Sequence, residues 1–297
     1  HRHGTPEQQE RYLQPLIAGR LKHWVAITEP NHGSNVAGIE TRAEDKGDYY
    51  WVNGSKLWIT NGVHGNFGVL VARTFSPNCD GGLSLFIVDR AQTNYEARRA
   101  DAMFIHATAT SQLTFSDAIV PKANLLGKEG EGLKTILTGL NFGRLNVAMG
   151  AAGAARAALD LSIDYAKQRK QFGKPIGGFQ LVQKLIVDMM ERCEAARALG
   201  YRAAWALDQG GSARAECSIA KLYAAEAAHE VASMALQVHG GLGYSEEFPI
   251  ERIFRDTRGG LIPEGTSEIQ TLIIGREVLG ISAFQGGKRM QGDLPWE

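Results

Sequence analysis

The sequence predicts an α+β multidomain fold, in which a middle antiparallel β domain, built as a barrel or sandwich, precedes a C-terminal four-helix bundle. Two observations predict this fold. Between residues 22 and 126, short runs rich in Val, Ile, Leu and Phe are bounded by Gly, Pro, Asn and Asp, which is typical of strands joined by close turns. From about Glu131 onward, Ala and Leu recur three and four residues apart over long stretches, and this indicates packed helices.

The composition excludes several classes of protein. Of the 297 residues, 44% are hydrophobic and 22% are charged, which is ordinary for a globular chain and argues against disorder. Lys plus Arg equals Asp plus Glu at 32 each, so the charge balance gives no reason to expect nucleic acid or an anionic membrane as a partner. No apolar run reaches the roughly 20 residues of a membrane span. The three cysteines are far apart and form no metal-binding pattern, so we predict reduced thiols and no metal.

The elements follow in order along the chain. Residues 5–21 predict a short helix, with Pro6 near its start and Gly19 near its end. In the β region, alternating apolar and polar residues on both sides of Asn53-Gly54 predict a hairpin. Helices are then predicted at about 131–168, 179–209, 213–238 and 267–279, and residues 241–266 are predicted to connect the last two. The sequence contains no internal repeat, and the tail 284–297 is expected to be mobile.

Two glycine-rich stretches do not form a dinucleotide fingerprint. Residues 149–153 lie inside a helical pattern, and residues 239–244 lack the preceding strand and the βαβ unit that a Rossmann fold requires. We expect close helix packing at the first stretch. Nicotinamide binding by the usual fold is therefore not predicted.

Three segments have compositions that suit a bound cofactor, although each also has an ordinary structural interpretation. Backbone N–H groups and hydroxyls of Thr28 and Ser34 in the turn ITEPNHGSN could hold an anion, or the segment could be a connecting loop. Trp58 and Thr60 are two residues apart, hence on one face of a strand, where an indole could cover an aromatic ring or could belong to the core. The cations of RKQFG suit a phosphate or a solvated helix end.

Glu264 is the candidate for acid–base chemistry. It lies between Pro263 and Gly265, before a helix whose N-cap is predicted at Thr266, with Glu268 in its first turn. Capping explains Thr266 and Glu268 but not Glu264. A carboxylate among Leu261, Ile262 and Pro263 would have a raised pKa and could act as a base near neutral pH; a solvated loop glutamate is the alternative.

Five segments in succession resemble the signature segments of the acyl-CoA dehydrogenase family. They read ITEPNHGSN, WITNG, RKQFGKPIGGFQ, QVHGGLGY and IPEGTSEIQTLIIGRE, and the resemblance runs from about Gly4 to Leu279. It implies a remnant of an N-terminal helical domain at 1–21, whose larger part is missing, a middle β domain at 22–126 that holds flavin and acyl-CoA, a helical bundle at 127–283 and a tail at 284–297. It also implies FAD bound at an interface between subunits of a homotetramer.

The resemblance assigns roles to individual residues. Glu264 would be the catalytic base that removes the α proton of an acyl-CoA while flavin N5 accepts the β hydride, giving the trans-2-enoyl-CoA. Ser34, Asn141, Arg144 and Gly265 would contact the substrate. The FAD contacts would be Ile27, Thr28, Ser34, Trp58, Ile59, Thr60, Arg169, Gln171, Phe172, Gln180, Gln237, Val238, Gly240, Gly241, Thr266 and Glu268.

Further expectations follow from the same resemblance. In some members the base lies at the position of Gly143, where glycine cannot serve, so Glu264 is the only candidate base. An electron-transferring flavoprotein would accept the electrons, and the enzyme would act in fatty acid β-oxidation, in the bacterial cytoplasm or the mitochondrial matrix. Pro263, which replaces a frequent aromatic residue, should reshape the acyl pocket, and residues 100–115 depart from the family pattern.

Two alternatives differ in chemistry. The first is an acyl-CoA oxidase or flavin monooxygenase of the same fold, which oxygen reactivity of the reduced flavin would reveal. The second is a non-catalytic protein that binds flavin or acyl-CoA. Retention of Glu264 together with the WITNG and RKQFG segments favours the dehydrogenase.

Overall fold

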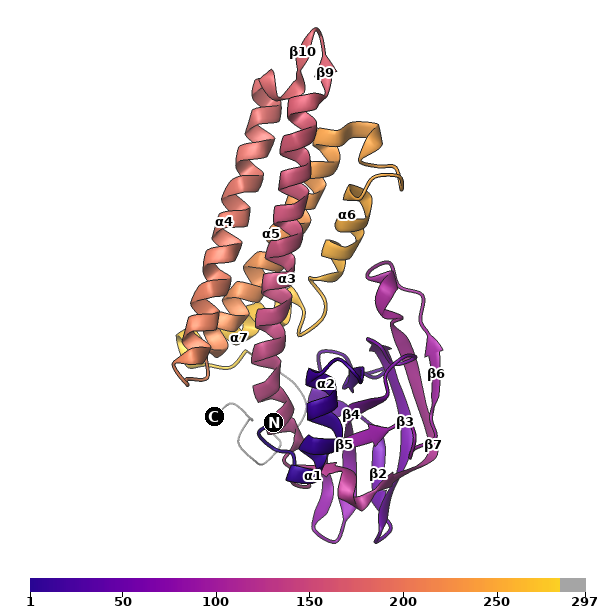
Figure 1. Ribbon diagram of the computed structural model, residues 1–297. Coiled ribbons are helices and arrows are strands. Elements are labelled where there is room, and N and C mark those ends of the chain that lie inside the picture. The colour runs from indigo at the N-terminus through magenta and orange to yellow at the C-terminus, as the bar shows by residue number, and fades with distance from the viewer. Residues whose placement is uncertain (284–297) are drawn as a thin grey trace. The chain divides into compact units, whose positions relative to one another are not determined.

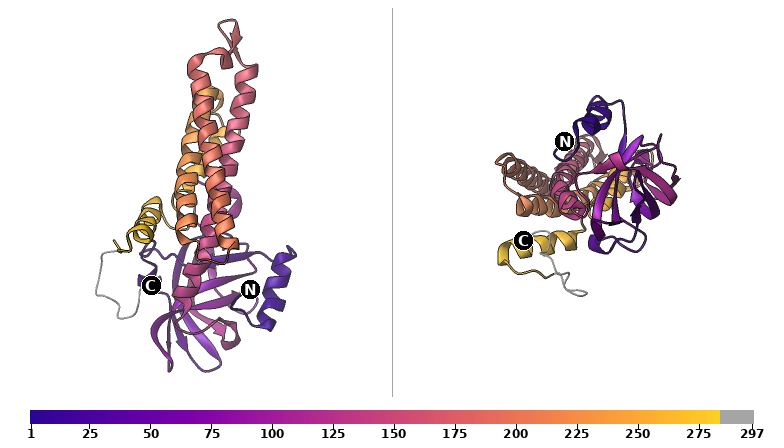
Figure 2. Two further views of the ribbon diagram at one scale, coloured as in Figure 1. Left: turned by 90° about the vertical axis from the view of Figure 1, so that its left-hand side faces the viewer. Right: turned by 90° about the horizontal axis from the view of Figure 1, so that it is seen from below.

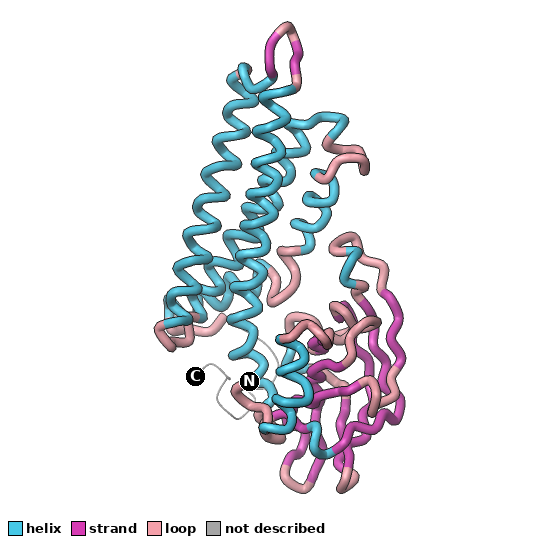
Figure 3. Tube along the Cα trace, in the orientation of Figure 1, coloured by secondary structure: helices cyan, strands magenta, loops and turns pink. Residues whose placement is uncertain are grey.

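The computed structural model describes residues 1–283 (Figures 1 and 3). The chain divides into two compact units, which we call unit 1 (residues 1–137) and unit 2 (from Thr138 onward). Unit 1 contains the eight-stranded sheet and unit 2 contains most of the helical residues, so the predicted α+β class is confirmed. The predicted tail, 284–297, lies outside the described residues.

Unit 1 opens with one continuous short helix. It consists of α1 (Pro6–Gln8), a π-helical turn (Gln9–Leu13) and α2 (Gln14–Ile17), and Thr5 caps its start. The side chain of Gln8 donates to the carbonyls of Ala123 and Leu125, both at 2.9 Å, which fastens the helix to the sheet. The predicted helix is therefore present, but it ends at Ile17 and contains a π-helical turn that the sequence pattern did not indicate.

The sheet of unit 1 has eight strands in a mixed arrangement. In the order β6-β7-β3-β2-β4-β5-β8, neighbouring strands are hydrogen-bonded, and β1 also pairs with β4. The pairs β1–β4 and β2–β4 are parallel and the others antiparallel, so the domain is not purely antiparallel. No pairing joins β6 to β8 in unit 1, so the sheet forms no closed barrel. The strands are β1 (His23–Ala26), β2 (Arg42–Asp45), β3 (Tyr49–Ile59), β4 (Phe67–Ser76), β5 (Cys79–Asp89), β6 (Glu96–Arg99), β7 (Ser111–Pro121) and β8 (Leu125–Leu126).

The hairpin predicted at Asn53-Gly54 is wrong. Both residues lie inside the single long strand β3, at a shift in its register with β7. Gly54 has φ 147°, and a Cβ atom there would lie 2.7 Å from the Cα atom of Thr41. Glycine is present because a neighbouring backbone approaches closely at a bulge, a use that the sequence pattern alone does not distinguish from a turn.

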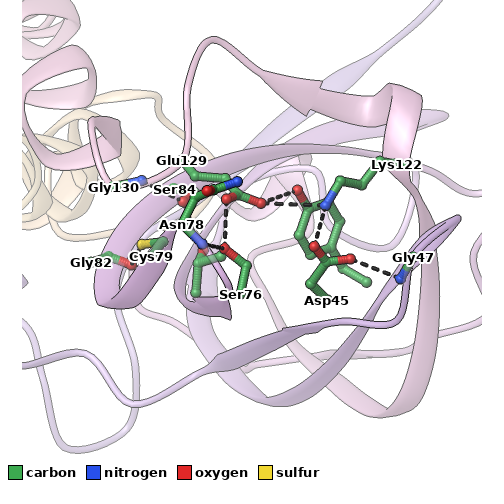
Figure 4. Close-up of polar contacts among 12 residues, drawn as sticks. Asp45, Gly47, Ser76, Asn78, Cys79, Gly82, Ser84, Lys122, Glu129 and Gly130 are labelled. Carbon is green, nitrogen blue, oxygen red and sulfur yellow. Dashed lines mark hydrogen bonds and ion pairs between the residues drawn. The ribbon is translucent and has the colours of Figure 1, made fainter.

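A polar network fastens the strand ends of unit 1 to the segment before α3 (Figure 4). Glu129 accepts hydrogen bonds from the hydroxyls of Tyr50 at 2.5 Å and Ser76 at 2.6 Å. The ammonium of Lys122 lies 2.5 Å from Asp45 and 3.5 Å from Glu129. Hydrogen bonds and ion pairs thus connect residues of three strands and two connecting segments in one network.

Unit 2 is a bundle of helices with an alanine-rich core. The long helices α3 (Gly132–Gln168, which begins in unit 1), α4 (Gln180–Asp208) and α5 (Arg214–His239) lie side by side (Figures 1 and 2), and α5 also contacts α6 (Ile250–Gly259) and α7 (Ser267–Leu279). A two-stranded hairpin, β9 (Lys170–Gln171) and β10 (Lys174–Pro175), joins α3 to α4. The helices predicted at 131–168, 179–209, 213–238 and 267–279 are confirmed to within a residue or so.

One feature of unit 2 differs from expectation. Helix α6 lies within the predicted connection. Ile250 and Ile253 have helical spacing and pack on the core, and the ring of Phe254 contacts His229 of α5. The close helix packing expected at residues 149–153 is present beside the two glycines. A Cβ atom built at Gly200 of α4 would lie 2.2 Å from Sδ of Met149, and Ala152 is buried, whereas nothing lies within 4 Å of a Cβ atom built at Gly150 or Gly153. Within residues 1–283, every helix is too short or too polar to serve as a membrane span.

Candidate active site

Glu264 lies in the turn of residues 261–265, called here the Glu264 turn, which connects α6 to α7. The hydroxyl of Thr266 accepts a hydrogen bond from the N–H of Ile269 at 3.3 Å and so caps α7, as the sequence predicts. The helix therefore begins after Glu264 and leaves it in irregular backbone. Glu264 has φ 58° and Gly265 has φ 90°, so both residues are left-handed.

The side chain of Glu264 points into unit 2 rather than into solvent. A Cβ atom built at Gly143 of α3 would lie 2.5 Å from Oε2 of Glu264, so the carboxylate rests against that glycine. Oε2 is buried and has no hydrogen-bond partner among the described residues. Burial raises the pKa of Glu264, and the positive charges of Arg144 and Lys221 oppose that rise. A glutamate with these surroundings is suited to accept a proton.

Three buried side chains donate hydrogen bonds to carbonyls of the Glu264 turn. Lys221 of α5 donates to Leu261 at 3.2 Å and to Gly265 at 2.8 Å. Gln270 of α7 donates to Glu264 at 2.8 Å and to Gly265 at 3.0 Å, and Arg144 of α3 donates to Glu264 at 3.4 Å. Sequence reasoning missed Lys221 and Gln270.

Asn141 and Arg144, assigned to the substrate by resemblance, are both 5% exposed. Nη1 of Arg144 donates to Oδ1 of Asn141 at 2.8 Å, and Nδ2 of Asn141 donates to the carbonyl of Ser212 at 2.9 Å. These contacts hold the guanidinium of Arg144 next to Glu264, to whose carbonyl it donates. A contact of either residue with substrate stays a prediction.

In unit 1, a buried ion pair holds the ITEP segment against β3. The ammonium of Lys56 lies 2.9 Å from Oε1 of Glu29 and donates to the carbonyl of Ile27 at 2.9 Å. Oxygens of Glu29 also accept the N–H groups of Glu40 at 2.6 Å and Thr41 at 2.7 Å. The N–H of Leu57 donates to the carbonyl of Thr28 at 2.9 Å. Ile27 and Thr28 are therefore fixed beside the residues that precede Trp58.

Trp58 and Thr60 do not share a strand face in the way predicted. Strand β3 ends at Ile59, so Thr60 lies outside the strand, and Trp58 has φ 62°, which is not strand backbone. Both side chains are nevertheless exposed, that of Trp58 to 54%, whereas Ile59 is buried. A non-glycine residue held in left-handed backbone with its aromatic ring in the open is typical of a binding surface.

Glu29, His32 and Glu40 are the one group of three potential metal ligands found within residues 1–283, with ligand atoms within 4.8 Å of one another. Both oxygens of Glu29 already accept N–H groups, and the Lys56 ammonium is a cation at the same carboxylate. This donor set is therefore poorly suited to a metal ion.

Most of the other residues assigned to FAD lie at two places in unit 2. Arg169, Gln171 and Phe172 are exposed at the β9–β10 hairpin, where Phe172 is 94% exposed with φ 50°, and Gln180 is exposed at the start of α4. At the end of α5, Gln237, Gly240 and Gly241 are exposed and Val238 is buried. Ser34, in the turn of unit 1, is exposed as well.

The fold defines a class, a protein in which a helical bundle follows a β unit and holds, in the turn before α7, a glutamate whose buried Oε2 has no hydrogen-bond partner among the described residues. Two family models match the chain: the acyl-CoA dehydrogenase middle domain at residues 25–118 and the acyl-CoA dehydrogenase C-terminal domain at residues 130–279. The chain belongs to the acyl-CoA dehydrogenase family, and the predicted family and enzyme class are thus confirmed.

Relatives and solved structures agree with that placement. The caffeyl-CoA reductase–Etf complex subunit CarC of Acetobacterium woodii is 42% identical over 91% of this chain and 72% of its own length. The structure of butyryl-CoA dehydrogenase from Megasphaera elsdenii matches with a TM-score of 0.89 at 38% identity, over 94% of this chain and 73% of that one. An FAD complex of PigA matches with a TM-score of 0.87 at 30% identity, over 93% and 73% respectively.

Proposed function

We propose that this chain removes hydrogen from the α and β carbons of an acyl-CoA thioester, with Glu264 as the base for the α proton. One observation carries the proposal: a buried carboxylate whose Oε2 atom has no partner among the described residues and whose pKa burial raises. A structural glutamate of this kind would normally be hydrogen-bonded, because an unsatisfied buried polar atom costs about 1–3 kcal/mol. A substrate proton is the partner that this oxygen lacks.

The surroundings of Glu264 suit abstraction of a weakly acidic proton. Burial removes the water that would otherwise stabilise the carboxylate, so the ionised group is a stronger base than in solution. Arg144 and Lys221 keep positive charge close to it, which favours the ionised form at rest. The backbone N–H of Glu264 is proposed to donate to the thioester oxygen and so stabilise the enolate-like charge.

FAD is the proposed cofactor, and the residues of unit 1 fit it. The exposed indole of Trp58 offers an aromatic face, and the carbonyls of Ile27 and Thr28 are already bonded to β3, which leaves the Thr28 side chain for the ring edge. Bound FAD would supply the acceptor for the hydride from the β carbon. The FAD complex of PigA supports the proposal, as a related fold that binds this cofactor.

We further propose that two copies of the chain share each FAD. The tip of the β9–β10 hairpin displays Arg169, Gln171 and the 94% exposed ring of Phe172, and an apolar ring so exposed suits a contact outside its own protomer. In the proposed homotetramer this tip, with Gln180, would bind the FAD of a neighbour, and the guanidinium of Arg169 would offset the charge of the pyrophosphate. The residues proposed to approach the adenosine are Gln237, Val238, Gly240 and Gly241, and Thr266 and Glu268 would also contact FAD.

Electron-transferring flavoprotein is the proposed electron partner, supported by the relative whose name places it in a complex with Etf. That relative is a reductase, which makes reduction of an enoyl thioester the second candidate function. Both directions use the same base position, because the acid that delivers the α proton in reduction is the protonated base of oxidation.

The test is anaerobic titration of the FAD-loaded protein with acyl-CoAs of different chain length, followed by flavin absorbance. Wild type is expected to bleach, and Glu264→Gln is expected to reduce at a rate about 10²–10⁴-fold lower with FAD still bound. Glu247→Gln, at an exposed loop position, is the matched control and should behave as wild type. Normal bleaching by Glu264→Gln would refute the assignment. Reoxidation by an enoyl-CoA measures the reverse direction, and rapid reoxidation by oxygen would indicate an oxidase or monooxygenase.

A further inference from the structure

The Glu264 turn is held in a conformation that its sequence does not favour. Glu264 and Gly265 are left-handed in succession, with φ 58° and φ 90°. Glycine adopts this region freely, but for glutamate it costs roughly 1–2 kcal/mol. A residue remains in such a conformation only where its surroundings impose it. The left-handed Glu264 must therefore be fixed by neighbouring groups.

Lys221 is the group that bridges the turn. Its ammonium donates to the carbonyl of Leu261, before Glu264, and to that of Gly265, after it, at 3.2 and 2.8 Å. Gln270 and Arg144 reach only the carbonyls of Glu264 and Gly265. Lys221 is thus the side chain, of these three, that ties the two ends of the turn to each other.

The burial of Lys221 is costly for a lysine. Its side chain is 0% exposed, and among residues 1–283 no carboxylate lies within ion-pair distance of its ammonium. Burial lowers the pKa of Lys221 to about 8, with the negative charge of Glu264 opposing. Lysine is rarely buried without a paired anion, so an apolar side chain would be expected on this face if packing alone mattered.

We infer that Lys221 is a positioning residue for Glu264: its buried ammonium ties the carbonyls of Leu261 and Gly265 together and so holds the base in the left-handed turn that directs its carboxylate at Gly143. The inference rests on the proposed function for the meaning of that position. The same ammonium supplies one of the two positive charges that favour ionised Glu264, the other being Arg144.

Charges on every packed element enter the expected pH dependence. Helix α3 presents Arg144 to Glu264, and α5 presents Lys221. Arg214 and Cys217 of α5 act on Arg144, while Glu226 of α5 and Glu268 of α7 act on Lys221. Replacing Lys221 by an uncharged side chain leaves Arg144 as the remaining cation beside Glu264, so the carboxylate should ionise at higher pH.

The experiment measures the titration of Glu264 directly, in the full chain labelled with glutamate carrying ¹³C in its side-chain carboxyl. The signal lost in Glu264→Gln identifies Glu264. In wild type its chemical shift should show a second, smaller step near pH 8, as Lys221 loses its proton. In Lys221→Met that step should vanish and the main titration should move upward by about one pH unit. Lys184→Met, an exposed lysine of α4, is the control and should change neither.

Activity gives the second measurement. For Lys221→Met, the acidic limb of the kcat/KM profile for an acyl-CoA should move upward with the NMR titration, while KM changes little. Lys221→Arg, which keeps a cation and donors, should restore the limb toward its wild-type position. Should Lys221→Met fail to fold, Lys221→Gln, which removes the charge but keeps a donor, takes its place, and the main titration should again move upward. Absence of the step near pH 8 in wild type and of any shift in the variant would overturn the inference. If instead Glu264→Gln is fully active while the titrations of Glu264 and Lys221 depend on each other as described, the proposed function fails. Lys221 would then still hold the Glu264 turn, but without a role in catalysis.

Discussion

Replacement of Lys56 by methionine is predicted to destabilise unit 1 by about 3–5 kcal/mol, the range for removing one partner of a buried ion pair. Lys56 is 0% exposed and Glu29 is 6% exposed, so the Glu29 carboxylate would remain buried without its cation, and the carbonyl of Ile27 would lose its hydrogen bond from Lys56. Methionine has a similar volume, which keeps any cavity small. Glu29 keeps its N–H bonds from Glu40 and Thr41, so the lower end of the range is expected.

The pKa values of both groups are lowered. The shift favours the charged form of Glu29 and disfavours the charged form of Lys56. Burial alone would raise the pKa of Glu29, but hydrogen bonds from Thr41 and Glu40 and the charge of Lys56 bring it below its usual value. Burial lowers the pKa of Lys56 to about 8 against the opposing effect of Glu29. Both groups are therefore charged at pH 7, and the assay belongs at that pH, where the pair is intact.

The assay is urea unfolding followed by tryptophan fluorescence, in which Trp24, Trp51 and Trp58 report on unit 1. Lys128→Met removes an exposed lysine whose ion pair with Glu131 spans 4.0 Å, and it should change stability by less than about 0.5 kcal/mol. The double variant Glu29→Gln, Lys56→Met should recover most of the loss, because no uncompensated charge remains. A Lys56→Met protein as stable as the Lys128→Met control would refute this account of the pair.

Two further predictions concern stability. Burial raises the pKa of Glu264 in the folded state above the value of 4.5 expected for the unfolded chain. Between these two pKa values the folded state keeps the carboxyl proton that the unfolded state has released. This contribution to folding stability is fully present below pH 4.5 and is lost as pH rises through the folded pKa. In thermal unfolding, Glu264→Gln should therefore be more stable than wild type at pH 7, by an amount that shrinks toward pH 4.5. A gain in stability that does not depend on pH would contradict this. At Gly68, an added Cβ atom would lie 1.9 Å from the ring of buried Trp24, so Gly68→Ala should destabilise the fold by about 1–3 kcal/mol or more. Gly139→Ala in α3 is the control, because nothing lies within 4 Å of its added Cβ atom, and it should be neutral or stabilising. Equal melting temperatures for the two variants would be inconsistent with the packing at Trp24.

Much of the fold could be predicted because the signals were local. The helices of unit 2 follow from apolar spacing and from breaks at Gly and Pro, and the Thr266 cap follows from side-chain chemistry. The errors arose where tertiary contacts decide. Gly54 has the local appearance of a turn, yet it is required by the approach of Thr41 across the sheet. The parallel pairing of β1 and β2 with β4 depends on residues distant in sequence, which no local pattern reports.

The candidate site divides in the same way. Glu264 could be singled out because neither capping nor helix periodicity explains it. Lys221 could have been noticed too, since it falls among the buried alanines of α5, with Cys217 and Ala224 at helical spacing on either side. The pairing of Lys56 with Glu29 could not have been found, because the two lie 27 residues apart and meet only when β3 passes the ITEP segment.

The most direct test of the central claim follows the proton itself. 3,3-Dimethylbutyryl-CoA has α hydrogens but no hydrogen on its β carbon, so it cannot be dehydrogenated, and its α hydrogens can only exchange with solvent. In D₂O, with the FAD-loaded protein and NMR or mass spectrometry as the readout, wild type is predicted to exchange these hydrogens, and Glu264→Gln is predicted to lose that exchange while Glu247→Gln keeps it. Exchange by Glu264→Gln at the wild-type rate would mean that another group removes the proton, and Glu264 would not be the base.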